Sequence, residues 1–354
     1  MNENTPFFSI GIASYNYSNF ILKGLEQIRK QSFKDYEVIV SDDCSTDDSV
    51  EVIRNFIEHN PDMKIRLITK DKNEGLISNK NTIIENHRGQ YLLLCDADDW
   101  MSDNLLENAY NKISQERPDR LICDIAHIDI NGNIIQREHL TEYQTKWGWL
   151  IHHGSFYKSE IIRNNGIRIE SHPDDVFFIM RFTDYCNKIS ILNDEIYYYW
   201  LVHKDSSGRK NQSDFGNSVF FDIIIKEKKL LIDYINLKKK ELSEVYTGDS
   251  EQVVADLNDI KLVFLKLYCF DIIFRMQELG LKEKKYYYKK LHEYCINLVP
   301  DMWDCSHIKR INDKSLRKIT MKAIKLIYVC EKTHIIIPFI ICFHILTRFV
   351  YIDQ

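Results

Sequence analysis

The run FFSIGIASYN at residues 7–16 decides the fold, because an apolar segment ends abruptly there in small polar residues. A short apolar run of this kind predicts a buried strand. Further along the chain the hydrophobic period alternates, with strands predicted at 37–40, 65–68 and 91–95 and helices at 20–28, 49–57 and 76–87. Alternating strands and helices, with continuously apolar strands, indicate an α/β fold whose mainly parallel, Rossmann-like sheet is covered by helices on both faces.

Polar residues follow three of the predicted strands directly. They are Ser14, Tyr15 and Asn16 after the first strand, Asp42 and Asp43 after the second, and Asp96, Asp98 and Asp99 after the fourth. Ligands of such sheets bind outside the carboxyl ends of the strands. Five aspartates at one edge are unfavourable unless a cation joins them, and oxygen-rich sites suit Mg²⁺ or Mn²⁺. Helix capping explains any one of these motifs equally well, but not their recurrence at matching strand ends.

The regular alternation of predicted strands and helices does not continue further along the chain. Residues 101–212 are irregular, with short strands predicted at 121–125 and 196–201. Long helical stretches follow at 219–242, 253–279 and 284–298. We therefore predict an α/β domain over residues 1–212 and a mostly α-helical domain over residues 213–354.

Composition limits the class of protein. The chain has 354 residues, of which 44% are hydrophobic and 28% charged, and its formal net charge of −5 provides no overall basic field for nucleic acid. Nine cysteines occur without a CxxC pair, and the N-terminal residues MNENTPFF are too polar for a signal peptide. Reduced thiols in a cytoplasmic protein are the expected state.

Charge is distributed unevenly. Residues 1–212 hold 24 Lys and Arg against 33 Asp and Glu, whereas residues 282–354 hold 14 against 7. The apolar stretch 335–350 contains sixteen residues and falls short of the roughly 20 that span a bilayer. It predicts either a buried core helix or an interfacial one. The segment 309–350 is thus a candidate for peripheral contact with the inner face of the cytoplasmic membrane, with a solvated helix face as the alternative.

Several motifs together resemble the inverting family 2 glycosyltransferases, which have a GT-A fold. IGIASYN (10–16) is similar to the opening strand of that family and its PTYN loop, and YEVIVSDDCSTDDS (36–49) to its DDGSTD segment. The run 72–99 resembles N-x-G-x-x-x-x-R-N-x-G followed by a strand and a DxDD motif. HGSFYKSEII (153–162), HPDDVFFIMRF (172–182) and IYYYWLVHKDSSGR (196–209) resemble the acceptor-side segment, the ED motif and the closing strand.

The resemblance implies a nucleotide-sugar donor lying across the strand ends. Ala13 and Tyr15 would line the base pocket, and Asp43, with Asp42 as the alternative, would accept the base N–H, which suits UDP. Asn73 and Lys80 would contact the base or the phosphates. Asp96 and Ala97 would complete the donor-binding set. Asp98, Asp96 and His203 would be the metal ligands. Mn²⁺ or Mg²⁺ would offset the charge of the departing diphosphate.

The same resemblance makes Asp175 the catalytic base. Direct displacement at an anomeric carbon needs a carboxylate on the acceptor side, which takes the proton from the attacking hydroxyl and leaves the configuration inverted. The acceptor would be a glycan or a lipid-linked glycan of a bacterial surface polysaccharide. Adjacent histidines at 152 and 153 are not expected to form a metal pair, because neighbouring residues on a strand point in opposite directions.

Three departures from the family pattern leave the chemistry intact. Ala13 replaces a proline, Cys44 a glycine and Lys80 an arginine, and none of these changes removes a needed carboxylate. Two other functions stay open from the residues alone. One is a nucleotidyltransferase, although the chain lacks an early glycine-rich phosphate loop. The other is a non-catalytic glycan-binding or assembly protein in which the helical region does the work.

Overall fold

The structure of the protein is a computed structural model. It describes residues 5–138, 151–170, 174–203, 218–244, 250–275, 279–309 and 318–340. The chain divides into two units, one containing the described residues up to His203 and the other those from Ser218 onward. The predicted boundary near residue 212 lies outside the described residues.

The first hundred residues form the predicted alternation of strands and helices. The elements are β1 (Phe8–Ser14), α1 (Ile21–Lys30), β2 (Tyr36–Asp42), α2 (Ser49–His59), β3 (Ile65–Thr69), α3 (Leu76–Asn86) and β4 (Tyr91–Asp96). Every residue of β1 and β2 is buried, as a sheet covered on both faces requires. The mixed α/β prediction is confirmed for this unit.

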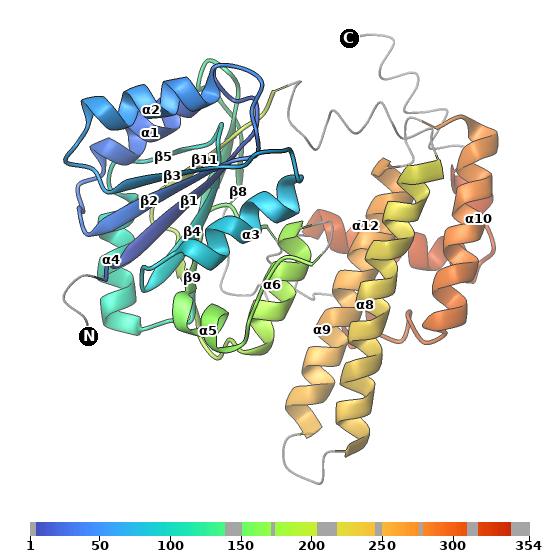
Figure 1. Cartoon of the computed structure of the whole chain (residues 1–354). Coiled ribbons are helices and arrows are strands. Elements are labelled where there is room, and N and C mark those ends of the chain that lie inside the picture. Colours follow the sequence, from blue (N-terminus) through green and yellow to red (C-terminus); the bar gives the residue numbers. More distant parts are fainter. Residues whose placement is uncertain are drawn as a thin grey trace. The chain divides into compact units, whose positions relative to one another are not determined.

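A seven-stranded sheet forms the core, in the order β10-β6-β9-β4-β1-β2-β3. Its pairs are parallel except where β9 (Ser155–Lys158) inserts antiparallel between β4 and β6. Helices α1 and α2 lie on one face of the sheet and α3 on the other (Figure 1). Gly11 in β1 lets α3 approach closely, because a Cβ there would clash with the Ile83 side chain.

A second sheet of four strands is ordered β5-β11-β7-β8. The elements of the rest of this unit are β5 (Trp100–Met101), α4 (Leu105–Glu116), β6 (Arg120–Cys123), β7 (Ile125–Ile128), β8 (Ile134–Glu138), β9, α5 (Ser159–Asn164), α6 (Asp174–Asp184), β10 (Ile189–Leu192) and β11 (Tyr198–Leu201). Strand β11 confirms the strand expected at 196–201, whereas β5, β8, β9 and β10 were not expected.

The strand predicted at 121–125 is present as β6, but it ends at Cys123 and Ile125 already belongs to β7. The chain leaves the large sheet after β6 and enters the small sheet at β7, and buried Asp124 marks the change. The Asp124 amide still donates to the Leu192 carbonyl of β10 in the large sheet, whereas its own carbonyl accepts from the Tyr197 amide just before β11 of the small sheet. An apolar run alone gives no sign of such a change of sheet.

The second unit is helical in its described parts. It contains α8 (Ser218–Glu244), α9 (Ser250–Phe270), the π-helical turn η1 (Asp271–Arg275), α10 (Leu281–Leu298), α11 (Ser306–Lys309) and α12 (Lys318–Lys332). Helix α9 contacts α8 and α12. Among the described residues no helix combines the length and apolar character needed to cross a membrane. Residues 341–350 of the apolar C-terminal stretch lie outside the description.

Candidate active site

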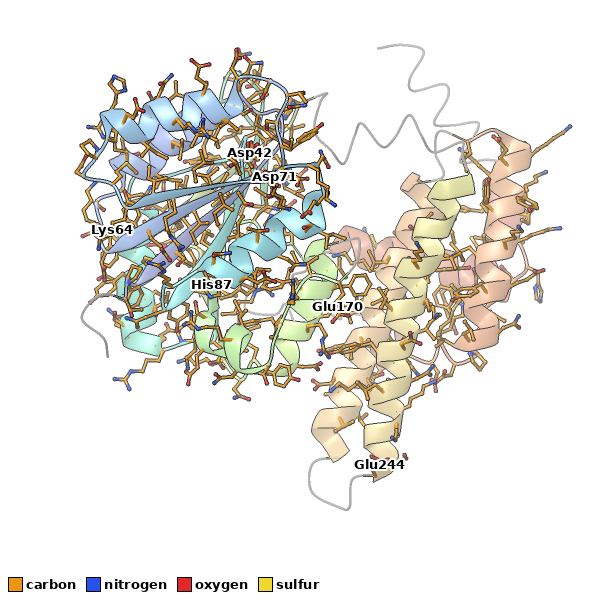
Figure 2. The ribbon with its side chains drawn as sticks, in the orientation of Figure 1. Asp42, Lys64, Asp71, His87, Glu170 and Glu244 are labelled. Atoms are coloured by element: carbon orange, nitrogen blue, oxygen red, sulfur yellow. The ribbon has the colours of Figure 1, made fainter. Side chains whose placement is uncertain are left out.

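The predicted edge exists and is set by strand register. Ser14 at the end of β1 pairs with Asp42 of β2, and Ala13 pairs with Asp96 of β4 on the other side. Figure 2 shows Asp42 and Asp71 at this end of the sheet, with Lys64, which precedes β3, at the opposite end. Parallel pairing therefore brings the polar residues that follow β1, β2 and β4 to one edge.

The loops after β1 and β2 are hydrogen-bonded to each other. The Asn16 side-chain oxygen accepts from the Thr46 amide at 2.8 Å, and the Asn16 amide donates to Ser45 Oγ at 2.9 Å. Asp42 is buried and accepts from the Ser45 amide and hydroxyl. The predicted base-contact residue Tyr15 lies in this frame with 40% of its surface exposed. An exposed ring on a braced loop is suited to pack on a planar ligand.

Asp43 organises the loop that precedes α3. Its two carboxylate oxygens accept from the backbone amides of Glu74 at 3.0 Å and Gly75 at 2.7 Å. Lys70 Nζ lies 3.2 Å from the same carboxylate. Asn73, predicted to contact the donor, is exposed on this loop and accepts from the Gly75 amide. Asp43 therefore orders the loop that carries Asn73, a role that the sequence did not indicate.

Helix α3 contributes three buried polar side chains in succession. Asn79 bonds to the hydroxyl and carbonyl of Ser41 and to the carbonyl of Ser14, which ties the ends of β1 and β2 together. Asn81 exchanges two hydrogen bonds with the backbone of Ile169, at 2.8 and 2.9 Å. Between them lies Lys80, only 3% exposed. Asn79 and Asn81 were missed as structural supports, although both lie in the motif quoted from this region.

Asp96 is surrounded by basic side chains. Its Oδ1 lies 3.5 Å from Lys80 Nζ and 3.4 Å from His152 Nε2. Its Oδ2 lies 3.2 Å from His153 Nε2. A metal ion can be shared by His, Cys, Asp and Glu side chains whose ligand atoms lie close enough together. Among the described residues, the group that meets this condition consists of Asp96, His152 and His153.

The expectation that His152 and His153 point in opposite directions is wrong. Both residues precede β9 rather than belonging to it, and their rings stack with centroids 4.3 Å apart. Gly154 makes the following turn with a φ of +64°, and a Cβ at this position would meet Cys123 Sγ at 2.6 Å. The alternation of side chains along a strand therefore does not apply to this pair.

Asp98 has a different partner from Asp96. His203, just after β11, places its Nε2 2.8 Å from Asp98 Oδ2. The next residue, Asp99, is buried and accepts from the Tyr198 hydroxyl at 2.8 Å and the Leu201 amide at 3.0 Å. Strand β4 ends at Asp96, so the three carboxylates of the DADD motif turn toward three different sets of partners.

The three carboxylates also differ electrostatically. Burial opposes ionisation of Asp96, but Lys80 and His152 hold its pKa well below the usual range. Burial and the neighbouring Asp96 charge raise the pKa of Asp98, and burial with both neighbours raises that of Asp99 well above its usual value. The positive charge near Asp96 therefore outweighs the effect of burial on its pKa, whereas the positive charge near Asp98 and Asp99 does not. A divalent cation next to Asp98 would supply it.

The residues present fit such an ion. Asp98 offers a carboxylate and His203 an imidazole, and His203 Nδ1 is buried with no hydrogen-bond partner among the described residues. Carboxylates suit Mg²⁺ and Mn²⁺, and an added imidazole favours Mn²⁺ over the harder Mg²⁺. Asp96 already faces the Lys80 ammonium, which leaves Asp98 and His203 as the better candidates of the predicted set. An ion held there would supply positive charge to a diphosphate.

The two remaining predicted positions are placed by the backbone. Ala97 is buried in the turn between Asp96 and Asp98. Asp175 is the second residue of α6, which begins at Asp174. The segment leading to this helix is anchored at Ile169 by Asn81. The assignment of Asp175 as catalytic base stays a prediction.

With the edge and its side chains in place, comparison with known proteins shows the class. The model of the family described as "Glycosyl transferase family 2" matches residues 9–185, which is half of the chain. The chain therefore belongs to glycosyl transferase family 2. This membership favours a glycosyltransferase over the nucleotidyltransferase alternative.

Individual relatives agree with this class. The chain is 24% identical over 285 residues to the poly(ribitol-phosphate) β-N-acetylglucosaminyltransferase TarS of Staphylococcus aureus, covering 77% of this chain and 47% of that protein. It is 25% identical over 255 residues to the glycosyltransferase GlyG of Streptococcus pneumoniae, covering 65% of this chain and 81% of that one. The chain thus spans about half the length of TarS.

Solved structures agree on the fold. The crystal structure of S. aureus TarS 1-349 in complex with UDP-GlcNAc superposes with a TM-score of 0.65 at 18% identity, covering 92% of both chains. The mannosyltransferase PcManGT of Pyrobaculum calidifontis, in complex with GDP-Man and Mn²⁺, superposes with a TM-score of 0.50 at 16% identity, covering 85% of this chain and 88% of the other. The fold is of the GT-A type, as the motifs predicted, with a helical C-terminal region, as the hydrophobic pattern after residue 212 predicted.

Proposed function

We propose that the protein is a metal-dependent, inverting glycosyltransferase that moves a sugar from a UDP-linked donor to a hydroxyl group of a glycan. The observation that carries the proposal is the strand register, which gathers Tyr15, Asp43 and Asp98 at one edge with His203. TarS has been crystallised with UDP-GlcNAc, and PcManGT with GDP-Man and Mn²⁺. TarS, the neighbour with the higher TM-score, supports a UDP-sugar, with UDP-GlcNAc the first donor to test. PcManGT supports Mn²⁺ as the cofactor.

Each chemical task has a candidate group. Tyr15 and the Asp43-ordered loop would hold the nucleotide, and Asp98 with His203 would hold the ion, which supplies positive charge to the diphosphate. Asp175 would take the proton of the attacking acceptor hydroxyl on the far side of the sugar, and inversion follows from that single displacement. The name of TarS, a poly(ribitol-phosphate) β-N-acetylglucosaminyltransferase, supports a bacterial surface polymer as the acceptor.

Release of UDP by the purified protein tests this function. The protein is incubated with a panel of UDP-sugars, with MnCl₂ or with EDTA, and free UDP is measured over time. We expect slow, Mn²⁺-dependent hydrolysis of at least one donor, because water substitutes poorly for the acceptor hydroxyl. Absence of release from every UDP-sugar, under conditions in which the protein is folded, would contradict the proposal.

Peripheral membrane contact is part of the same proposal. In α12, Leu326 and Val329 are 48% and 50% exposed, and the nearby Lys322 and Lys332 are also exposed. Exposed apolar side chains between lysines are suited to the surface of an anionic bilayer. Flotation with vesicles containing anionic lipid should recover the protein in the floating layer, and Leu326→Glu with Val329→Glu should reduce that recovery. Equal recovery of the two proteins would contradict the contact.

A further inference from the structure

His153 occupies an unusual place between two acidic side chains. Its Nε2 lies 3.2 Å from Asp96 Oδ2 and 3.5 Å from Asp99 Oδ2. One ring nitrogen therefore contacts the carboxylates on both sides of Asp98, the candidate metal ligand. The side chain is only 5% exposed, so these contacts are shielded from water.

Stacking fixes the orientation of this imidazole. On one face lies His152, with ring centroids 4.3 Å apart, and Trp200 also stacks on His153, with centroids 4.1 Å apart and an interplanar angle of 14°. Trp200 is in turn packed against His127, at 4.8 Å. A ring held between two others cannot turn its nitrogen away from Asp96 without losing these contacts.

The other ring nitrogen, Nδ1, indicates which nitrogen of His153 carries the proton. His153 Nδ1 is buried and has no hydrogen-bond partner among the described residues. A buried N–H without an acceptor is costly, so the neutral ring carries its proton on Nε2, where Asp96 Oδ2 accepts it at 3.2 Å. The polar contribution of His153 is thus directed entirely at Asp96 and Asp99.

A metal ion shared by Asp96, His152 and His153 fits the surroundings less well. The Lys80 ammonium lies 3.5 Å from Asp96 Oδ1 and 3.4 Å from His152 Nε2. A divalent ion there would face this buried cation at close range. The group is better explained as a support for the neighbouring site than as a second metal site.

We propose that His153, oriented by Trp200, is a positioning residue that holds the Asp96 and Asp99 carboxylates in the arrangement that Mn²⁺-dependent binding of UDP at Asp98 requires. This inference rests on the proposed function. Partners that hydrogen-bond to the residues around a metal typically contribute 10–100-fold to metal affinity or activity. His153 acts through Asp96 and Asp99 and touches neither the sugar nor its acceptor in this role.

Calorimetric titration with UDP, in MnCl₂ and separately in EDTA, tests the inference. The measured quantity is the ratio of UDP affinity with Mn²⁺ to UDP affinity without it. His153→Phe keeps an aromatic ring between His152 and Trp200 but removes the Nε2 donor, and we expect this ratio to fall about 10–100-fold. His153→Gln, which retains an amide N–H donor, should recover a ratio within about threefold of the wild type.

The matched control is His127→Phe, whose ring also packs against Trp200. It preserves a ring there and removes the hydrogen bond of His127 Nε2 with Glu138, so it should leave the ratio unchanged. A purely structural role for His153 would lower thermal stability and reduce UDP affinity equally with and without Mn²⁺. An unchanged ratio in His153→Phe, or in His153→Leu should the first variant not fold, would overturn the inference. If the wild-type protein shows no Mn²⁺-dependent UDP binding at all, the proposed function fails instead.

Discussion

His203 Nε2 and Asp98 Oδ2 lie 2.8 Å apart, although 105 residues separate them in the chain. The contact joins the loop after β11 to the turn after β4, and both side chains are less than 10% exposed. His203 also packs against Phe20, with ring centroids 4.9 Å apart. The imidazole is therefore already held beside the carboxylate with which it would bind an ion.

The first prediction concerns this pair. Asp98→Asn and His203→Gln should each weaken Mn²⁺-dependent UDP binding at least about tenfold, because each removes one of the two candidate ligands. Calorimetry with UDP and MnCl₂ measures the effect. Asp71→Asn is the matched control, since Asp71 is an exposed carboxylate at the same end of the sheet (Figure 2). Unchanged binding in both site variants would exclude this position for the metal.

The catalytic assignment of Asp175 gives a second prediction. Asp175→Asn should abolish sugar transfer to the acceptor and leave UDP affinity within about threefold, because an amide cannot accept the proton of the attacking hydroxyl. Transfer is measured with a labelled UDP-sugar and binding by calorimetry on the same preparation. Asp194→Asn, in the loop between β10 and β11, serves as a control for loss of a carboxylate elsewhere in the unit. Full transfer activity in Asp175→Asn would refute the assignment.

Asn81 supports the segment that leads to Asp175. Replacement by Ala removes both hydrogen bonds to buried Ile169 and leaves its N–H and C=O unpaired, so we expect a loss of about 2–3 kcal/mol in the free energy of unfolding. Urea denaturation measures this loss, and the transfer rate should fall with it. Asn86→Ala is the control in the same helix, because within the described part of the chain the Asn86 side chain bonds only to the Thr82 carbonyl one turn earlier. A similar, small effect of both changes would count against a supporting role for Asn81.

The strand ends could be predicted from the sequence because two simple regularities determine them. Continuous apolar runs identify the parallel strands, and parallel register then brings Ser14, Asp42 and Asp96 to one edge. The family motifs added the expected roles of these residues. The resemblance also named Asp98 and His203 together as metal ligands, and their side chains do lie in contact.

The partners of Asp96 could not be predicted in the same way. His152 and His153 lie in an irregular segment, and their direction depends on a turn at Gly154 that no hydrophobic period reveals. The change of sheet at Asp124 is hidden for a similar reason, since a buried aspartate inside an apolar run carries no topological signal. The anchoring roles of Asp43 and Asn79 depend on backbone groups, which are the same at every position of the chain.

The helical unit contains a buried ion pair that gives a further prediction. Lys228 Nζ in α8 lies 2.6 Å from Asp271 Oδ2 in η1, and both side chains are fully buried. Asp271→Asn should destabilise the protein by about 3–5 kcal/mol, because it leaves a buried ammonium without its counter-charge. The double variant Lys228→Met with Asp271→Leu should recover most of this loss. Loss of helical circular dichroism in urea measures both, and a double variant no more stable than Asp271→Asn would contradict the charge argument.

Cys44 provides the last prediction, because it stands where the family pattern has glycine. Its φ is +63°, in the left-handed region, which costs a residue with a Cβ roughly 1–2 kcal/mol. Cys44→Gly removes this strain but adds backbone freedom to the unfolded chain, so a net gain of about 0.5–1 kcal/mol in the free energy of unfolding is expected. Cys44→Ala retains the Cβ and should show no such gain in the same urea titrations. If glycine destabilises the loop instead, contacts of the half-buried Cys44 side chain outweigh the backbone strain.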